Sequence, residues 1–499
     1  MRGPFSLLGL ILLPAIAGAA DWPQWGGRDD RNMVSDEKGL PESFVPGTKS
    51  PQGTGIDLAT TCNVKWIARL GSQTLGNPTV AGGRVFLGTN DDGLVDPRAK
   101  PTKGGLLVCL DEATGTPLWH LPVPRFETQV SDLRYDDMNL GICSSPTVDG
   151  NRVYLVTNRC EVLSLDVAGT AAGNWRYDIM RELNVWPQDA ANCSVLVHGD
   201  LVYACTSNGV DRSHVRVPSP LAPSLIALDK KTGRLAAVDD EKIGMRLFHG
   251  QWSSPSLGVV NGRPLVFFGA GDGVVYAFEA LARVPDRPVF LKKIWSFDCN
   301  PPEYKIVGGK RVNYRDGDVR RHRGNANDGQ FLGPSEIIAT PVFYKNRVYV
   351  ATGQDPAHGR GRGMLSCIDA TKTGDVTIGG KVWTYDRIGR SLSTVAIADG
   401  LLYAADTLEG LHCLDADTGQ CYWFQSLGSE VWGSPYVADG KVYLGTKKGL
   451  TVMAAGKQPK LLADVHLGTP CYCTPVAANG VLYVTSQRYL WAVEAKRGR

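Results

Sequence analysis

Residues 434–446 read SPYVADGKVYLGT, and residues 77–89 read NPTVAGGRVFLGT. Each stretch has a short apolar run, a turn that carries Gly, and a second run in which Val and aromatic residues alternate with other types. This is the pattern of a β-hairpin. Six further stretches repeat it, at residues 145–157, 193–206, 254–270, 340–352, 393–406 and 474–486. The sequence therefore contains eight copies of one hairpin.

A second pattern follows most copies and ends in a tryptophan. Cys109-Leu110-Asp111 continues through Thr114-Gly115 to Trp119, and Cys413-Leu414-Asp415 continues through Thr418-Gly419 to Trp423. Asp and Thr side chains can accept from the amides of a tight turn, and Gly tolerates positive φ, so the pattern predicts two more strands joined by such a turn. The large apolar rings are predicted to pack one four-stranded sheet on the next. These blade-docking residues are Trp66, Trp119, Trp175, Trp295, Trp383 and Trp423.

Eight copies of about four strands predict an all-β chain that folds as a single eight-bladed β-propeller. The copies lie between Trp66 and Val493, at roughly 54 residues per copy. The last copy ends after its third strand, at residues 489–493, and a surplus strand, Val64–Ile67, precedes the first copy. We expect the N-terminal strand to complete the last blade, which closes the ring and removes the exposed sheet edges.

Composition excludes several other classes of protein. The 499 residues include 58 Gly and 30 Pro, with 43% hydrophobic and 21% charged residues, which is ordinary for a globular protein and excludes a disordered or collagen-like chain. Lys and Arg number 53 against 50 Asp and Glu, a net charge of +3. Such a balance gives no support for a nucleic-acid partner.

The N-terminus has the features of an export signal. Arg2 precedes an apolar run over residues 5–16, and small residues follow at 17–20. This predicts a signal peptide over residues 1–20 and a secreted or periplasmic protein. No later apolar run is long enough for a transmembrane segment. Residues 21–61 are predicted to form an N-terminal wrapping segment, and residues 62–495 the propeller.

The repeat resembles the quinoprotein, or PQQ-like, repeat, whose signature is Ala-x-Asp-x-x-Thr-Gly-x-x-x-Trp. Asp111 to Trp119 and Asp415 to Trp423 match it, with Cys in the Ala position. The resemblance recurs over residues 62–495. Asp21-Trp22-Pro23-Gln24-Trp25 also looks like the start of many secreted BamB-like bacterial proteins. The motif itself is architectural and does not specify a function.

Two functions accompany this resemblance. BamB-like proteins are non-enzymatic scaffolds, which implies a monomeric binding module with no cofactor and a protein or polymer partner on its faces or loops. The alternative is a PQQ-dependent alcohol or sugar dehydrogenase, or a degenerate relative, which implies PQQ with calcium. The alcohol enzymes place a disulfide of adjacent cysteines over PQQ, whereas the nearest pair here is Cys471-Tyr472-Cys473. Carbohydrate binding through the rim aromatics Trp186 and Trp432 is a third interpretation.

Residues just before each first strand are expected to lie near the central channel. A tryptophan there could stack a planar ligand, and an acidic side chain could act as base or metal ligand. The opposite interpretation is a water-filled funnel with polar walls and tryptophan plugs. No catalytic residue is assigned. The candidates for ligand contact are Asp189, His249, Gln251, Trp252, Glu336, Arg390 and Trp432.

The histidines and cysteines give no metal signature. His249, His322 and His358 are far apart in the sequence, so they are interpreted as isolated residues, and no metal site is predicted. Cys193 with Cys205, and Cys413 with Cys421, flank predicted turns almost symmetrically. Each pair is a candidate disulfide in an exported protein, and the alternative is that these are small buried residues.

Overall fold

The computed structural model describes residues 20–51, 53, 55–93, 101–307, 309–311, 315–316, 319–320, 335–358, 361–408 and 410–495. Apart from Ala20, the predicted signal peptide lies outside the described residues. Within the described residues, no helix combines the length and the hydropathy needed to cross a bilayer.

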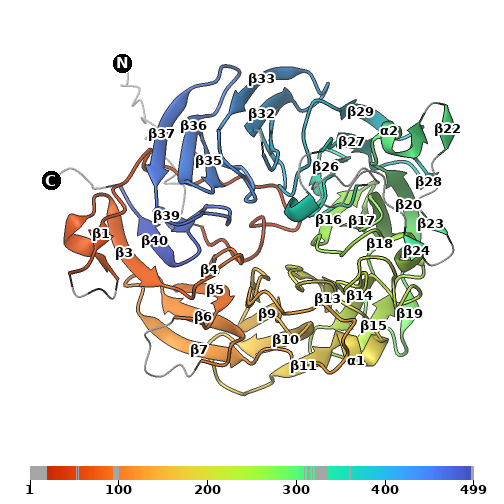
Figure 1. Cartoon of the computed structure of the whole chain (residues 1–499), viewed down its shortest axis with the longest axis horizontal. Coiled ribbons are helices and arrows are strands. Elements are labelled where there is room, and N and C mark those ends of the chain that lie inside the picture. Colours follow the sequence, from red (N-terminus) through yellow and green to blue (C-terminus); the bar gives the residue numbers. More distant parts are fainter. Residues whose placement is uncertain are drawn as a thin grey trace, which may run out of the picture.

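Eight antiparallel sheets stand around a central axis, as the sequence predicts (Figure 1). Blade 1 consists of β4 (Thr79–Ala81), β5 (Arg84–Asn90), β6 (Gly105–Asp111) and β7 (Pro117–Val123). Blade 2 consists of β8 (Thr147–Asp149), β9 (Arg152–Val156), β10 (Glu161–Asp166) and β11 (Trp175–Asp178). Blade 3 consists of β12 (Leu196–His198), β13 (Leu201–Cys205), β14 (Leu225–Asp229) and β15 (Leu235–Val238). Blade 4 consists of β16 (Ser256–Val260), β17 (Arg263–Gly269), β18 (Val274–Glu279) and β20 (Lys293–Asp298).

The second half of the ring repeats this arrangement. Blade 5 consists of β25 (Val342–Tyr344), β26 (Arg347–Ala351), β27 (Leu365–Asp369) and β29 (Lys381–Tyr385). Blade 6 consists of β30 (Ala396–Ala398), β31 (Leu401–Ala405), β32 (Gly410–Asp415) and β33 (Cys421–Ser426). Blade 7 consists of β34 (Tyr436–Ala438), β35 (Lys441–Thr446), β36 (Gly449–Ala454) and β37 (Leu461–His466). Blade 8 consists of β38 (Val476–Ala478), β39 (Val481–Thr485), β40 (Tyr489–Val493) and β3 (Val64–Arg69).

The N-terminal strand closes the ring. Strand β3 pairs antiparallel with β40, with Ile67 opposite Trp491 and Arg69 opposite Tyr489. The prediction that an early strand completes the last blade is confirmed. The two ends of the propeller are thus joined by backbone hydrogen bonds rather than by side-chain packing alone.

Short strands, helices and hairpins are added to the blades or lie in the connections between strands. Strands β19 (Val289–Phe290) and β28 (Gly374–Asp375) add parallel outer strands to blades 3 and 4. Helices α1 (Ile179–Leu183) and α2 (Pro302–Lys305), with the 3-10 turns Leu58–Thr60, Ile243–Arg246 and Pro356–His358, lie in connections. Three small hairpins complete the described part of the chain: β1 (Thr48–Lys49) with β2 (Ile56–Asp57), β21 (Ile306–Val307) with β22 (Lys310–Arg311), and β23 (Arg315–Asp316) with β24 (Val319–Arg320).

The six blade-docking tryptophans lie between neighbouring blades. Trp119 of β7 donates its indole N–H to Val167 O of blade 2 at 3.0 Å, and Trp423 of β33 donates to Gly456 O of blade 7 at 2.9 Å. Each ring also packs on an aromatic residue of its own blade, as Phe86 does on Trp119. The same indole-to-carbonyl bond to the next blade is made by Trp66, Trp175, Trp295 and Trp383.

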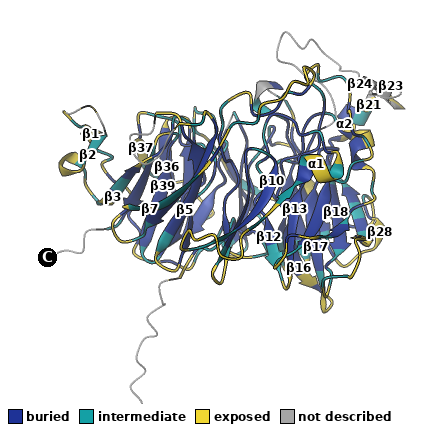
Figure 2. Ribbon diagram, turned by 90° about the horizontal axis from the view of Figure 1, so that it is seen from below, coloured by how far each residue is buried: buried dark blue, intermediate teal, exposed yellow. Residues whose placement is uncertain are grey.

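The ring has two different faces. The tight turns between first and second strands, such as Gly82-Gly83, lie on one face, which we call the hairpin face. The longer connections, between second and third strands and between blades, lie on the other, which we call the loop face. Helices α1 and α2 belong to the loop face (Figure 2).

The N-terminal segment, residues 21–37, crosses the axis at the hairpin face instead of lying only along the outside of the ring (Figure 1). Its backbone and side chains bond to the first-strand region of every blade. The blade partners are Val80, Val148, Val195, Leu257, Phe343, Ile397, Val437 and Asn479. At its centre, the fully buried Arg31 donates to Val195 O at 2.9 Å and to Pro255 O at 3.1 Å.

Candidate functional site

A belt of small polar residues surrounds the axis, one from each blade, just before the first strand. In seven places, among the residues that the structure describes, the amide N–H of one belt residue donates to the side-chain oxygen of another, at 2.6–3.1 Å. The bonds join neighbouring blades, for example Ser145 N to Ser194 Oγ at 3.0 Å. We call these residues the axial belt: Asn77, Ser145, Ser194, Ser254, Thr340, Thr394, Ser434 and Thr474.

A cavity of about 160 Å³ lies inside the axial belt. Trp25 of the N-terminal segment lines it and donates its indole N–H to Thr340 Oγ1 at 3.0 Å. Trp432 also lines it and stacks on Tyr472, with ring centroids 4.1 Å apart and an interplanar angle of 17°. One face of the Trp432 ring is therefore already covered by a side chain of the protein.

The axial cavity does not fit PQQ with calcium. Its lining contains no charged side chain among the described residues, although PQQ is a flat anion and calcium prefers carboxylate oxygens. Cofactor sites occupy about 300–1,000 Å³, and the cavity is about 160 Å³. Neither the charge nor the volume of the cavity suits the group.

Three of the predicted channel residues meet on the loop face beside the cavity. The rings of His249 and Trp252 contact edge to face, with centroids 5.1 Å apart, and His249 Nε2 lies 4.0 Å from Asp189 Oδ2. Trp252 is fixed by its indole N–H, which donates to Gln188 O and Ala190 O at 3.2 and 2.9 Å. Trp252 also lines the axial cavity, so it separates the cavity from His249.

Glu336 and Arg390 connect to the same region through residues of blade 5. Glu336 Oε1 accepts from Asp355 N at 3.0 Å, and Arg390 Nη1 donates to His358 O at 2.8 Å. Burial lowers the pKa of Arg390, and the nearby Tyr304 and Glu336 raise it in part. Both side chains are thus buried anchors of the loop that carries Asp355 and His358.

Gln251 has a structural position on the loop face. Its Nε2 donates to Asn208 O at 3.2 Å and to Ser224 Oγ at 2.9 Å, inside blade 3. The side chain is almost completely buried, at 1% exposure. Gln251 therefore holds the connection between blades 3 and 4 against the loop after β13.

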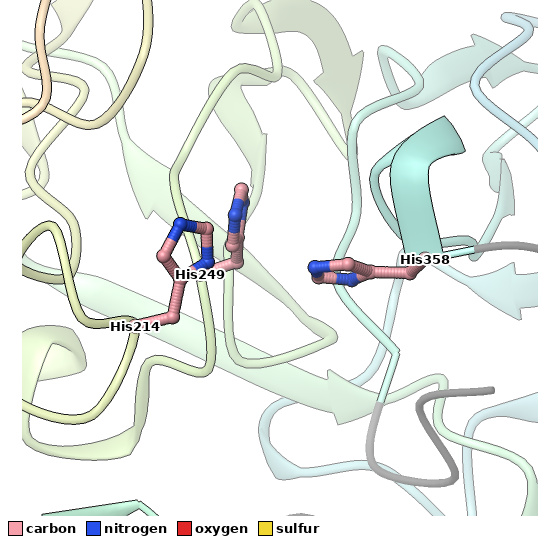
Figure 3. Close-up of side chains that lie close together, drawn as sticks. All are labelled: His214, His249 and His358. Atoms are coloured by element: carbon pink, nitrogen blue, oxygen red, sulfur yellow. The ribbon is translucent and has the colours of Figure 1, made fainter. Parts of the chain in front are cut away.

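The interpretation of His249 and His358 as isolated residues is wrong. Their rings lie with centroids 4.8 Å apart, and His214 approaches His249 to the same centroid distance of 4.8 Å (Figure 3). The physical reason is that the circular arrangement of the blades brings the loops of blades 3 and 5 together, although these loops are far apart in the sequence. His322, named in the same prediction, lies outside the described residues.

Asp189 has a perturbed environment beside this group. Burial raises its pKa to about 6, and the presence of Arg134, whose Nε lies 3.0 Å from Oδ1, lowers it in part. Asp355 contributes a further rise through charge repulsion. The backbone of Asp189 is left-handed, with φ 56°. This conformation is uncommon for a residue other than Gly, which indicates that the surrounding structure fixes the residue in place.

Three features of this region were not predicted from the sequence: His214, Asp355 and the axial belt. The belt did leave a signal, since a Ser, Thr or Asn stands at or beside the start of every repeat copy. His214 and Asp355 left none, because they lie in connections whose length and sequence differ between copies.

All twelve cysteines lie in the described part of the chain and are free thiols there. Cys205 N donates to Cys193 Sγ at 3.2 Å, so these two residues are neighbours across the hairpin. Cys421 lies opposite Leu414, and Cys413 lies opposite Trp423, so the two cysteines are not direct cross-strand partners. The two disulfide pairings stay predictions.

The fold and the repeats define the class of the protein, an eight-bladed β-propeller built from PQQ-like repeats. The sequence model of the family described as outer membrane protein assembly factor BamB matches residues 98–287 and 361–459, more than half of the chain. The chain belongs to this family of BamB-like, PQQ-like repeat propellers. No curated protein matches it in sequence.

Solved structures share the fold at low sequence identity. BamB from Moraxella catarrhalis is 13% identical, with a TM-score of 0.53 over 87% of this chain and 97% of that one. A europium-containing methanol dehydrogenase is 14% identical, with a TM-score of 0.56 over 93% of this chain and 89% of that one. The chain is therefore similar in fold both to an assembly factor and to an enzyme.

Proposed function

We infer that the chain is a non-catalytic binding module of the bacterial cell envelope, secreted or periplasmic, that holds a protein or polymer partner on its loop face. The observation that carries this proposal is the axial cavity, which is small, lined by uncharged residues and bordered by Trp25 of the chain's own N-terminal segment. The family description, an assembly factor, supports a scaffold over an enzyme.

The loop face offers exposed apolar side chains for such a partner. Leu221, in the connection after β13, is 69% exposed, and Met245, in the connection after β15, is 49% exposed. The two connections contact each other, since a Cβ on Gly244 would lie 2.5 Å from Pro220 O. Contiguous exposed apolar side chains can mark a protein-binding surface.

The connection that carries Leu221 is held rigidly at its other end. Arg212 donates to Ser131 O and Leu133 O at 3.0 Å each, and to Asp137 Oδ2 at 2.6 Å. Asp137 also pairs with Arg125 at 3.3 Å. A binding surface whose loops are already ordered loses less entropy when a partner binds, which favours affinity.

Site-specific photocrosslinking tests this proposal. A photoreactive phenylalanine replaces Leu221 in one variant and Val259 in another, and the cell envelope of the producing bacterium is irradiated. Val259 is a matched control, because it is 57% exposed and lies on β16 next to its hairpin turn. The proposal expects a discrete adduct from position 221 and none from position 259.

Two results would oppose the proposal. One is an adduct from position 259 with none from position 221, which would place the partner on the hairpin face. The other is a 221 adduct that persists when Met245 is replaced by Asp, since a partner that binds the apolar pair must lose affinity when a charge enters it.

A further inference from the structure

Three imidazole rings converge on the loop face from three separate connections (Figure 3). His214 lies between β13 and β14 of blade 3, His249 between blades 3 and 4, and His358 at the end of the 3-10 turn Pro356–His358 in blade 5. One nitrogen of each ring lies within 4.8 Å of one nitrogen of each of the other two. We call these three residues the histidine cluster.

Two carboxylates adjoin the histidine cluster. One ligand atom each of Asp189, His249 and Asp355 lie within 4.8 Å of one another. His249 thus belongs to both groups and stands between the other two imidazoles and the two acidic side chains. The two carboxylates therefore adjoin the histidine cluster through His249.

This donor set selects a chemical class of ligand. Imidazole nitrogens suit Zn²⁺, Cu²⁺, Ni²⁺ and Co²⁺, whereas Ca²⁺ and Mg²⁺ prefer sites made of oxygen alone. Three histidines with an open fourth position are a common zinc arrangement. We propose that His214, His249 and His358 bind a divalent transition-metal ion of the Zn²⁺ type, with Asp189 and Asp355 balancing its charge. This inference does not depend on the proposed function.

Two members of the histidine cluster are buried and held by neighbouring residues, unlike histidines that meet by chance on a surface. His249 is 2% exposed and His358 is 4% exposed, although histidine is more often partly exposed in proteins. The backbone of His358 is held by Arg390, and the ring of His249 is held against Trp252. His214 is half-buried, which leaves an approach for an ion from solvent.

Binding requires a small contraction of the cluster. Two nitrogens that each lie about 2.0 Å from a tetrahedral zinc ion are roughly 3.3 Å apart, whereas the cluster's nitrogens are up to 4.8 Å apart. His214 and His358, whose ring centroids are 6.5 Å apart, have the largest distance to close. Both lie in loops, which can shift by this amount more easily than strands.

Arg134 adjoins both groups of donors. Its Nη1 lies 3.3 Å from His214 Nε2, and its Nε lies 3.0 Å from Asp189 Oδ1. An ion that binds His214 through Nε2 must replace the contact with Arg134 Nη1, since a guanidinium can only donate. The ion pair between Arg134 and Asp189 uses a different nitrogen, Nε.

Zinc binding to the full chain tests the proposal. The protein is treated with a chelator, dialysed and titrated with ZnCl₂ in a calorimeter, and the zinc environment is then measured by X-ray absorption. We expect one Zn²⁺ per chain, with nitrogen and oxygen ligands near 2.0 Å and the scattering pattern of imidazole. A sulfur shell near 2.3 Å would instead place the ion on cysteines and overturn the proposal.

Substitutions make the test specific to these residues. His249→Gln and His358→Gln are each expected to weaken zinc binding by at least about 100-fold, since loss of even a supporting residue costs 10–100-fold. His466→Gln is the matched control, because His466 is an exposed residue at the end of β37 in blade 7. Equal zinc uptake by the wild type and a variant with all three cluster histidines changed to Gln would refute the assignment. If a variant does not fold, the X-ray absorption spectrum of the zinc-loaded wild type still shows whether the ligands are imidazoles.

Discussion

Trp25 donates its indole N–H to Thr340 Oγ1 at 3.0 Å, although the two residues are 315 positions apart in the chain. The bond joins the N-terminal segment to the axial belt at blade 5. It places an aromatic ring of the segment in the lining of the axial cavity. The segment is therefore part of the propeller's core, whereas strand β3 closes the ring.

The segment's bonds to the blades predict a large loss of stability when one is removed. Asn32 is 4% exposed, and its side chain accepts from Ile397 N at 2.8 Å and donates to Ile397 O at 2.9 Å. Asn32→Ala leaves both backbone groups buried without these partners, so we expect it to cost about 2–4 kcal/mol. Asn151→Ala, in an exposed hairpin turn, should stay within about 0.5 kcal/mol of the wild type. Urea denaturation measures both, and equal midpoints for the two variants would show that the segment contributes little.

Packing between blades predicts a second effect on stability. Gly115 has φ 71°, and a Cβ there would lie 2.5 Å from Trp66 Cδ2 in the preceding blade. Gly115→Ala combines a left-handed alanine, about 1–2 kcal/mol, with overpacking, about 1–3 kcal/mol. Gly150 has φ 58° and open space around its Cβ, so Gly150→Ala should show only the first cost. Gly115→Ala should therefore have a lower unfolding temperature than Gly150→Ala. The reverse order would contradict the docking role of Trp66.

Asp239 predicts a pH dependence of folding. Burial raises its pKa, and three backbone amides, of Leu225, Ser224 and Glu241, lower it in part. A carboxyl whose pKa is higher in the folded state contributes stability below its unfolded pKa, and that contribution is lost as the pH rises through its folded pKa. Between about pH 4 and pH 7, wild-type stability should therefore fall relative to Asp239→Asn. Asp239→Asn also loses a hydrogen-bond acceptor, which changes its free energy of unfolding by the same amount at every pH. If the free energy of unfolding of the wild type rose relative to that of Asp239→Asn over this pH range, the raised pKa would be excluded.

Metal loading predicts a stabilisation that chelation reverses. A ligand present at 100 times its dissociation constant stabilises the folded state by about 2.7 kcal/mol. Zn²⁺ should raise the unfolding temperature of the wild type, and a chelator should return it to the starting value. At the same zinc concentration His358→Gln should show a much smaller shift than the wild type, and His466→Gln should shift as the wild type does. A zinc shift of equal size in His358→Gln would remove the histidine cluster as its cause.

The repeats made the architecture predictable, since every blade carries its own local signal. The hairpin at residues 434–446 and the closing strand at residues 64–67 were identifiable because side-chain alternation and turn residues are encoded within a few positions. Cys421 shows the limit of this reasoning. Its near-symmetry with Cys413 about the predicted turn suggested a cross-strand pair, whereas Cys421 lies opposite Leu414. A one-residue bulge recurs at this position in other blades, for example between Cys109 and Leu110, and turn symmetry does not account for it.

The candidate site was only partly predictable, because it is assembled from connections. The copies placed Asp189, His249, Trp252, Glu336 and Arg390 before first strands, and the structure brings them to one side of the loop face. His214 and Asp355 lie in connections after second strands, where length varies from blade to blade. Their approach to His249 depends on how blades 3 and 5 and the connection between blades 3 and 4 lie around the axis, which no single copy encodes.

Equilibrium binding of PQQ tests the central claim most directly. The full chain, with calcium present, is titrated with PQQ while tryptophan fluorescence is followed, and dye-linked alcohol and sugar oxidation is assayed on the same samples. Because the axial cavity is small and lined by uncharged residues, including Trp25, we predict no saturable quenching and no oxidation. Binding of one PQQ per chain, with or without oxidation, would contradict the assignment of the axis as a closed structural core.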